Sequence, residues 1–128
     1  MRLLLDTHAL LWFRAGSVKL SRTAKAAIED PANEVIVSVA SLWELAIKIS
    51  LNRLTLEDSL ADFSKRIVIE SAIEIATIEV RHVFALAAMP FHHRDPFDRL
   101  LASHCLSDGL ELVSADEILD KYGVRRVW

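Results

Sequence analysis

The stretch RLLLDTHALLWFR, residues Arg2 to Arg14, decides the fold class of this 128-residue chain. Arg2–Leu5 is a short, continuous apolar run, as expected of a strand buried on both faces of a parallel sheet. The run stops at Asp6, and His8–Arg14 then follows at helical spacing, with Asp6 or Thr7 placed to cap the helix. A buried strand that leads directly into a helix predicts an α/β fold.

The rest of the chain continues this alternation of strands and helices. Further strands are predicted at Glu34–Val39, Ile73–Ile75, Leu110–Ser114 and Val124–Trp128. Helices are predicted at Ser21–Asp30, Ser41–Leu51, Thr55–Ile69, Glu79–Ala88, Phe97–Ser107 and Asp116–Tyr122. Ser41 and Glu44 have the spacing of a capping box, and Thr55 or Asp58 is placed to cap the next helix. The order predicts a central parallel sheet covered by helices on both faces.

The composition suits one compact domain spanning residues 1–128, because apolar residues make up 52% of the chain. A net charge of −3 argues against a sequence-independent nucleic-acid clamp, which is usually strongly basic. It does not exclude a nuclease, since acids that hold a catalytic metal also lower the pI. The single cysteine, Cys105, cannot form an intrachain disulfide. We therefore expect a reduced, cytoplasmic setting, with no signal peptide and no association with a membrane.

Four acids occupy equivalent places near the carboxyl ends of predicted strands. Asp6 follows the first strand directly, and Glu44 lies early in the helix after the second. Asp98 lies in the first turn of a later helix, and Asp116 stands two residues beyond LELVS. Ligands of parallel sheets bind at this edge, where converging carboxylates raise each other's pKa until a cation relieves the repulsion. Oxygen ligands favour Mg²⁺ or Mn²⁺ over zinc.

Each acid taken alone also has a structural explanation. Asp6 and Asp116 can cap the helices that follow them, and Glu44 can pair with Lys48 one turn further on. Asp98 suits the first turn of any helix. The joint pattern favours a common site, because independent helix caps have no reason to follow successive strands at the edge where ligands bind.

Four segments carry a pattern that goes beyond the acids: LLLDTHALLW (Leu3–Trp12), VSVASLWELAIK (Val37–Lys48), MPFHHRDPFDRLLASHC (Met89–Cys105) and LVSADEILDKYGVRRV (Leu112–Val127). In these segments the sequence resembles the PIN-domain family, and within it the VapC-type toxins of bacterial toxin–antitoxin pairs. The resemblance runs essentially from end to end, although the segment between Thr55 and Ala88 matches only in the order of its elements. HHRDPFDRLL is its most specific motif.

The resemblance implies an α/β/α sandwich with a central parallel sheet and the activity of a metal-dependent endoribonuclease. It implies that Asp6 and Asp98 bind Mg²⁺ or Mn²⁺ directly, and that Glu44 and Asp116 complete the cluster, often through water. A water activated by the metal would then attack the phosphodiester. The resemblance further implies an RNA substrate, a cognate antitoxin protein that blocks the site, and a homodimer.

Several neighbours of the acids are candidates for the substrate or for orienting the metal ligands. Ser114 fits the serine or threonine that the family carries two residues before the last acid, whereas Leu119 stands where an aromatic residue is common. Thr7 is placed either to cap its helix or to bond a metal-bound water. Asp95 and the proline after it set a helix start that points Asp98 at the sheet edge.

The basic side chains of the same motif are open to more than one interpretation. Arg99 can contact a phosphate or pair with an acid, and we favour the acid. His92 and His93 are adjacent and therefore point in different directions, which makes a poor zinc site. We expect one of the two to order its loop or to contact RNA.

Exposed aromatic side chains can bind either bases or a protein. Trp12, Phe13 and Trp43 could stack on bases, although packing in the core or at a partner interface is the favoured role. An exposed apolar segment near Trp43 or Phe63 would be the place to seek an antitoxin.

Three other functions compete with the ribonuclease. A catalytically inactive domain could bind RNA or protein, although retention of all four acids argues against it. An aspartate-nucleophile phosphotransferase would use Asp6, but such enzymes normally carry a second aspartate two residues later, where His8 stands here. A DNA nuclease remains possible, because no residue pattern in the sequence indicates a contact with the 2′-hydroxyl that distinguishes RNA from DNA.

Overall fold

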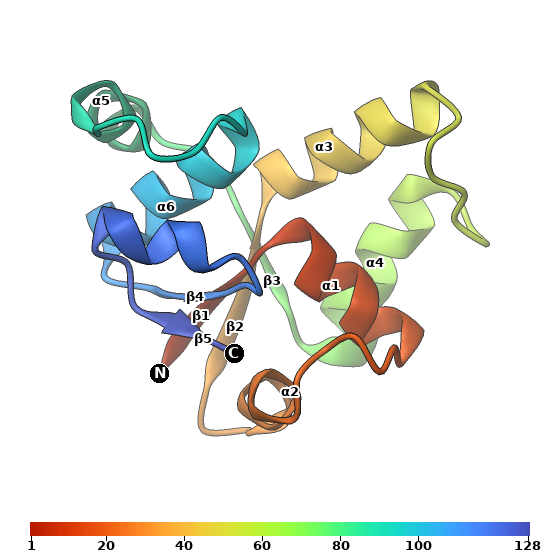
Figure 1. Cartoon of the computed structure of the whole chain (residues 1–128). Helices are drawn as coiled ribbons and strands as arrows, with labels where there is room; N and C mark the ends of the chain where they lie inside the picture. Colours follow the sequence, from red (N-terminus) through yellow and green to blue (C-terminus); the bar gives the residue numbers. More distant parts are fainter.

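Strand β1 (Arg2–Leu5) lies at the centre of a five-stranded sheet in the computed structural model, which describes all 128 residues (Figure 1). β2 (Glu34–Ser38) and β4 (Glu111–Val113) flank it, and β3 (Glu74–Ala76) and β5 (Arg126–Val127) form the edges, in the order β3-β2-β1-β4-β5. Every neighbouring pair is parallel. The predicted central parallel sheet is therefore confirmed.

Helices connect the strands and cover the sheet. They are α1 (Thr7–Ala15), α2 (Arg22–Glu29), α3 (Val39–Ser50), α4 (Leu60–Ser71), α5 (Val80–Ala88), α6 (Pro96–Asp108) and the 3-10 helix η1 (Glu117–Tyr122). Figure 1 shows α1, α2 and α4 on one side of the sheet and α5 and α6 on the other. None of these helices combines the length and the apolar character that a membrane crossing requires.

Alternate residues of β1 point into two separate hydrophobic cores. Leu3 and Leu5 pack with Leu10 of α1 and Ile67 of α4 on one face. Leu4 points to the other face, where it joins a cluster that includes Leu101 and Cys105 of α6 and Leu119 and Tyr122 of η1. All three leucines of the strand are fully buried. The two-residue period of a strand thus explains why Leu3, Leu4 and Leu5 are all apolar and why helices cover both faces of the sheet in an α/β/α sandwich.

The carboxyl ends of the three central strands lie side by side and bring distant segments together. Leu5 pairs with Val37 on β2 and with Val113 on β4. The backbone N–H of Asp6 still donates to the carbonyl of Val113 (3.0 Å), so the chain leaves the sheet level with the end of β4. The first turns of α1, α3 and α6 gather beyond this edge (Figure 1). Residues that follow these strands are therefore neighbours.

Helix α3 begins earlier than the sequence predicted. Ser38 caps it, since its hydroxyl oxygen accepts the N–H of Ala40 (3.0 Å), and Val39 is its first residue. Ser41 is consequently buried within the first turn. The predicted capping box between Ser41 and Glu44 is wrong, and Glu44 in the second turn is free for other contacts.

Helix α4 begins later than predicted, at Leu60. Ser59 caps it through the N–H of Asp62 (3.1 Å), which satisfies a donor of the first turn. Thr55 is therefore not the cap, and Asp58 instead pairs with Arg66 (2.8 Å).

Strand β3 also starts one residue later than predicted. Ala72 ends α4 in the left-handed region (φ 52°), and the N–H of Ile73 bonds back to Ile67 of that helix (3.1 Å). Ile73 is thus part of the helix terminus, and only Glu74–Ala76 joins the sheet.

Candidate metal centre

Asp6 serves as a helix cap and as part of the acidic cluster. Its Oδ1 accepts the N–H of Ala9 (2.7 Å) at the start of α1, and only 6% of the residue is exposed. Burial raises the pKa of the Asp6 carboxyl, while bonds from the Ser114 hydroxyl and from Ala9 lower it. The capping and the functional interpretations of Asp6 are therefore compatible.

Glu44 lies at the same edge, on α3, and is almost fully buried. The hydroxyl of Thr7 donates to its Oε1 (2.7 Å), and Nζ of Lys48 lies 3.0 Å from its Oε2. Lys48 pairs with Glu44 as the helical spacing predicted. Thr7 does not cap α1, because Asp6 does so. The Thr7 hydroxyl instead holds a buried carboxylate in place.

Asp98 sits in the first turn of α6, where Asp95 and Pro96 start the helix as predicted. Oδ1 of Asp95 accepts the N–H groups of Phe97 (2.8 Å) and Asp98 (3.4 Å). Burial, followed by the negative charges of Asp95 and Asp6, raises the pKa of Asp98 to about 7. Glu44 raises this pKa further, and His93 lowers it. The carboxylates predicted to converge therefore do act on one another.

His93 connects Asp98 to the fourth acid, Asp116. Its Nε2 lies 2.6 Å from Oδ2 of Asp116 and 3.3 Å from Oδ2 of Asp98. The backbone N–H of Asp95 donates to Nδ1 of His93 (3.0 Å), so the hydrogen of a neutral ring lies on Nε2. His93 is thus a hydrogen-bond donor to the acids. A ring in this tautomer offers no lone pair at Nε2 to a metal.

Asp116 itself caps η1 through the N–H of Ile118 (3.0 Å), and its own N–H donates to the hydroxyl of Ser114 (3.1 Å). Ser114 is fully buried between β4 and this turn. Since Ser114 also bonds Asp6, one hydroxyl fixes two of the four acids. The structure therefore brings the four predicted acids together, with Thr7, Ser114 and His93 among them.

A family model of the PIN domain matches residues 3–124 of this chain. The chain belongs to the PIN domain family. The resemblance inferred from the four sequence segments is thereby confirmed.

Individual relatives of this PIN domain agree with the family match. Ribonuclease VapC22 of Mycobacterium tuberculosis (strain ATCC 25618 / H37Rv) is 29% identical over 119 residues, which are 91% of this chain and 88% of the relative. A chain in the structure of VapBC2 from Rickettsia felis bound to a DNA fragment from their promoter superposes with a TM-score of 0.70 at 18% identity, covering all of both chains. A chain of VapBC-1 from nontypeable Haemophilus influenzae gives 0.66 at 14% identity, covering 98% of this chain and 96% of that one. These superpositions support the sandwich fold.

The sequence prediction about Arg99 of this PIN domain, that it pairs with an acid, is wrong. Arg99 pairs with no acid and is only 6% exposed, so it is not placed to contact a phosphate. It donates to the carbonyl of Pro90 (2.9 Å) and to the hydroxyl of Tyr122 (3.2 Å), and its guanidinium lies 3.8 Å from the centre of the Phe91 ring. A buried cation needs hydrogen-bond acceptors or an aromatic face as partners. Arg99 therefore orders the segment before α6 by binding the Pro90 carbonyl, the Tyr122 hydroxyl and the Phe91 ring.

Tyr122 is the residue of this region that sequence reasoning missed. Its hydroxyl accepts the backbone N–H groups of His92 (2.9 Å) and His93 (2.8 Å), besides the Arg99 contact. His92 itself is exposed, and its ring packs edge-on against Tyr122 (5.0 Å between centroids). Tyr122 thus positions the histidine that holds Asp116.

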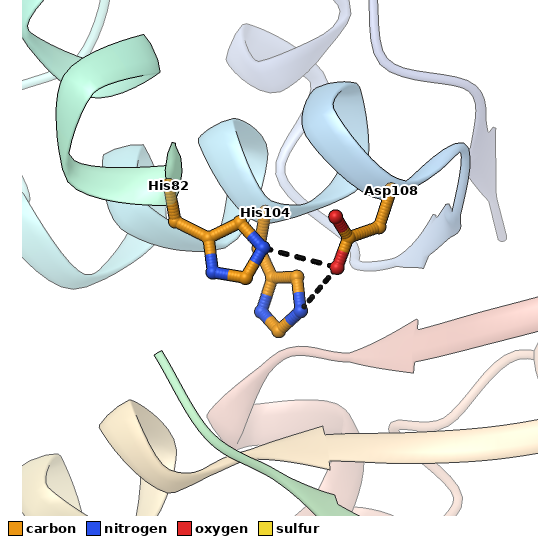
Figure 2. Close-up of side chains that lie close together, drawn as sticks. All are labelled: His82, His104 and Asp108. Carbon is orange, nitrogen blue, oxygen red and sulfur yellow. Dashed lines mark hydrogen bonds and ion pairs between the residues drawn. The ribbon is translucent and has the colours of Figure 1, made fainter. Parts of the chain in front are cut away.

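A second group with metal-like spacing lies between α5 and α6, well away from the four acids. Figure 2 shows His82 of α5 and His104 of α6 both directed at one oxygen of Asp108, at 3.0 and 3.2 Å. The N–H of Glu79 donates to Nδ1 of His82 (2.9 Å), which places the ring hydrogen on Nε2, toward Asp108.

Further contacts identify this second group as structural. Arg81 donates hydrogen bonds to both oxygens of Asp108 (3.0 and 3.2 Å) and thereby lowers the pKa of that carboxyl to about 2. Burial lowers the pKa of His104, which favours its neutral form. With His82 donating and Asp108 already paired, the group fastens α5 to α6 and is poorly suited to a metal.

Proposed function

We propose that this PIN domain is a metal-dependent endoribonuclease and the toxin of a toxin–antitoxin pair, folding as one domain over residues 1–128. The observation that carries the proposal is the convergence of Asp6, Glu44, Asp98 and Asp116 at the carboxyl edge of the sheet. The similarity to Ribonuclease VapC22, which extends over most of both chains, supports RNA as the substrate. Because cellular RNA is its substrate, we propose that the protein acts in the cytoplasm.

The acidic cluster fits a hard divalent cation. Its donors are carboxylate oxygens, which suit Mg²⁺ or Mn²⁺. Burial, and then the negative charges of Asp95 and Asp6, raise the pKa of Asp98 to about 7, and a bound cation would offset both effects. Asp6 and Asp98 would hold the ion directly, and Glu44 and Asp116 would complete its surroundings through water. Bound there, the ion supplies a water of lowered pKa and neutralises charge on the phosphodiester.

The remaining polar residues position the acids. The Thr7 hydroxyl and the Lys48 ammonium each hold one oxygen of Glu44, which fixes the plane of its carboxylate. Nε2–H of His93 orients Asp116 and approaches Asp98, while its Nδ1 is held by the backbone of Asp95. Such a pre-formed arrangement requires little reorganisation during the reaction.

The structural neighbours support an antitoxin as a partner, because both are toxin–antitoxin proteins of the VapBC type. The partner site that we propose is a groove of about 590 Å³ beside Phe63, between α1 and the segment leading into α4. Leu11 and Trp12 supply apolar walls, and Arg14 and Arg66 supply charge at its margin. We further propose a homodimer that places the RNA-binding surfaces of two copies next to each other.

No observation favours the phosphotransferase. His8, which stands where a second aspartate would be needed, is exposed and stacks on Trp12 (5.5 Å between centroids). An inactive binding domain is distinguished from the enzyme by experiment.

The test is cleavage of a pool of structured cellular RNAs by purified, antitoxin-free protein in Mn²⁺, Mg²⁺ or EDTA. The matched variants are Asp98→Asn in the cluster and Asp62→Asn on the exposed surface of α4. We expect discrete cuts that need metal, persist in Asp62→Asn and vanish in Asp98→Asn. Equal cleavage by all three proteins would refute the proposed role of Asp98, and RNA binding without any cleavage would favour the inactive binding domain.

A further inference from the structure

The indole of Trp43 stands exposed at the rim of the acidic cluster. Trp43 directly precedes Glu44 on α3, and Phe97 directly precedes Asp98 on α6. The two rings touch in an edge-on arrangement, with centroids 5.1 Å apart and planes at 68°. Even so, 60% of Trp43 remains accessible to solvent. An edge-on contact with one neighbour leaves at least one face of the indole uncovered.

The same two helices therefore carry an outer aromatic pair and an inner acidic pair. Glu44 lies near enough to Asp98 to raise the pKa of its carboxyl, so the two acids belong to one cluster. Consecutive residues of a helix point about 100° apart, which places Trp43 beside the acids rather than among them. The ring therefore lies on the border of the proposed reaction site.

We propose that Trp43 is a stacking platform for an unpaired base next to the scissile phosphodiester, and thus a residue that positions the substrate. This inference rests on the proposed ribonuclease function. A base inside a duplex presents no free face, whereas an unpaired base can stack on an aromatic side chain. Stacking of one base contributes about 5- to 150-fold in affinity and tolerates every base, since each has a π-face.

The surroundings of Trp43 favour a base over a protein partner. Val39 is the only other strongly exposed large hydrophobic residue on α3. These two side chains alone bury far less than the roughly 1,000 Å² of a stable protein interface. The other two tryptophans are already packed, since Trp12 and Trp128 contact each other (5.9 Å) and the hydrophobic core. Trp43 is thus the one tryptophan of the three that is largely exposed.

The kinetic test compares wild type with Trp43→Ala and Trp43→Phe on a short oligonucleotide that spans a cleavage site, offered unpaired and in a duplex. We expect wild type to prefer the unpaired form and Trp43→Ala to raise KM about 5-fold or more. Trp43→Phe should restore most of the loss, because a phenyl ring still stacks. Circular dichroism and thermal melting verify that both variants are folded.

Fluorescence provides a second measurement that does not depend on cleavage. In a variant with Trp12→Phe and Trp128→Phe, Trp43 is the sole tryptophan, and single-stranded RNA of about 12 nucleotides should quench its emission to saturation. The matching duplex at equal concentration should quench it far less.

The outcomes separate this inference from the ribonuclease proposal. If wild type cuts RNA but Trp43→Ala cuts unpaired RNA with unchanged KM, the platform is refuted and the ribonuclease stands. If the kinetics are unchanged while Trp43→Ala alters the size of the protein in solution, Trp43 belongs to a contact between copies and the inference is likewise overturned. If wild type cuts no RNA, the ribonuclease proposal fails first.

Discussion

Replacing Asp98 by asparagine should stabilise the metal-free protein at alkaline pH while removing its ability to hold the cation. The folded-state pKa of Asp98 is about 7, compared with 3.8 for an ordinary aspartate. Folding therefore opposes ionisation of this group, and stability falls as pH rises from 3.8 to about 7. The side chain is only 22% exposed, so solvent screens little of this effect.

The size of the effect follows from the pKa difference. A shift of about three units corresponds to about 4 kcal/mol of lost stability near pH 8, at about 1.4 kcal/mol per unit. Near pH 5, where the folded protein keeps the proton, the loss falls to about 2 kcal/mol. Asparagine has nearly the same shape without the charge, so Asp98→Asn should recover much of this energy.

Urea unfolding in EDTA near pH 8 and near pH 5 measures the difference in free energy of unfolding between wild type and Asp98→Asn directly. We expect Asp98→Asn to exceed wild type in stability near pH 8 and to lose part of that advantage near pH 5. Added Mn²⁺ should stabilise wild type but not the variant, because a ligand raises stability only where it binds. A variant that is equal to or less stable than wild type near pH 8 in EDTA would refute the reasoning.

Three further predictions concern the supporting residues. Thr7→Val removes the hydroxyl that anchors Glu44, so kcat/KM in Mn²⁺ should fall about tenfold; an unchanged value would show that this bond is dispensable. Arg99→Leu keeps apolar volume but removes a charged hydrogen-bond donor from Tyr122. Urea unfolding should therefore show that the free energy of unfolding falls by about 2–4 kcal/mol, and a fall of less than about 1 kcal/mol would contradict the role of Arg99 in ordering the segment before α6. Because the pKa of His104 is lowered, stability should fall as pH drops below 6.5, by up to about 1.4 kcal/mol per pH unit. His104→Gln should flatten that slope in urea titrations, and an identical slope would mean that other groups titrate.

The sequence was sufficient to predict the sheet and the positions of the four acids because both depend on local patterns. The apolar run of β1 ends at Asp6, and Asp95 with Pro96 specifies the start of α6 within a few residues. The carboxyl edge of a parallel sheet then brings such residues together without any knowledge of distant contacts. Their roles as metal ligands stay a prediction.

The contacts that orient the acids could not be predicted, because they join residues far apart in the chain. The bond from Thr7 to Glu44 spans 37 residues, and the bond from His93 to Asp116 spans 23. Arg99 illustrates the error that follows: the sequence analysis favoured an acid as its partner, but tertiary packing buried it against Tyr122. Local spacing does not specify which side chain fills a place in the core.

Calorimetric titration of Mn²⁺ into the metal-free protein near pH 8 tests most directly whether the acidic cluster is a metal site. We expect binding to wild type and to the surface control Asp62→Asn, with at least about a tenfold loss of affinity in Asp98→Asn, whose neutral side chain is a far weaker ligand. Binding of equal strength by all three proteins, or no binding by wild type, would contradict a metal site at these acids.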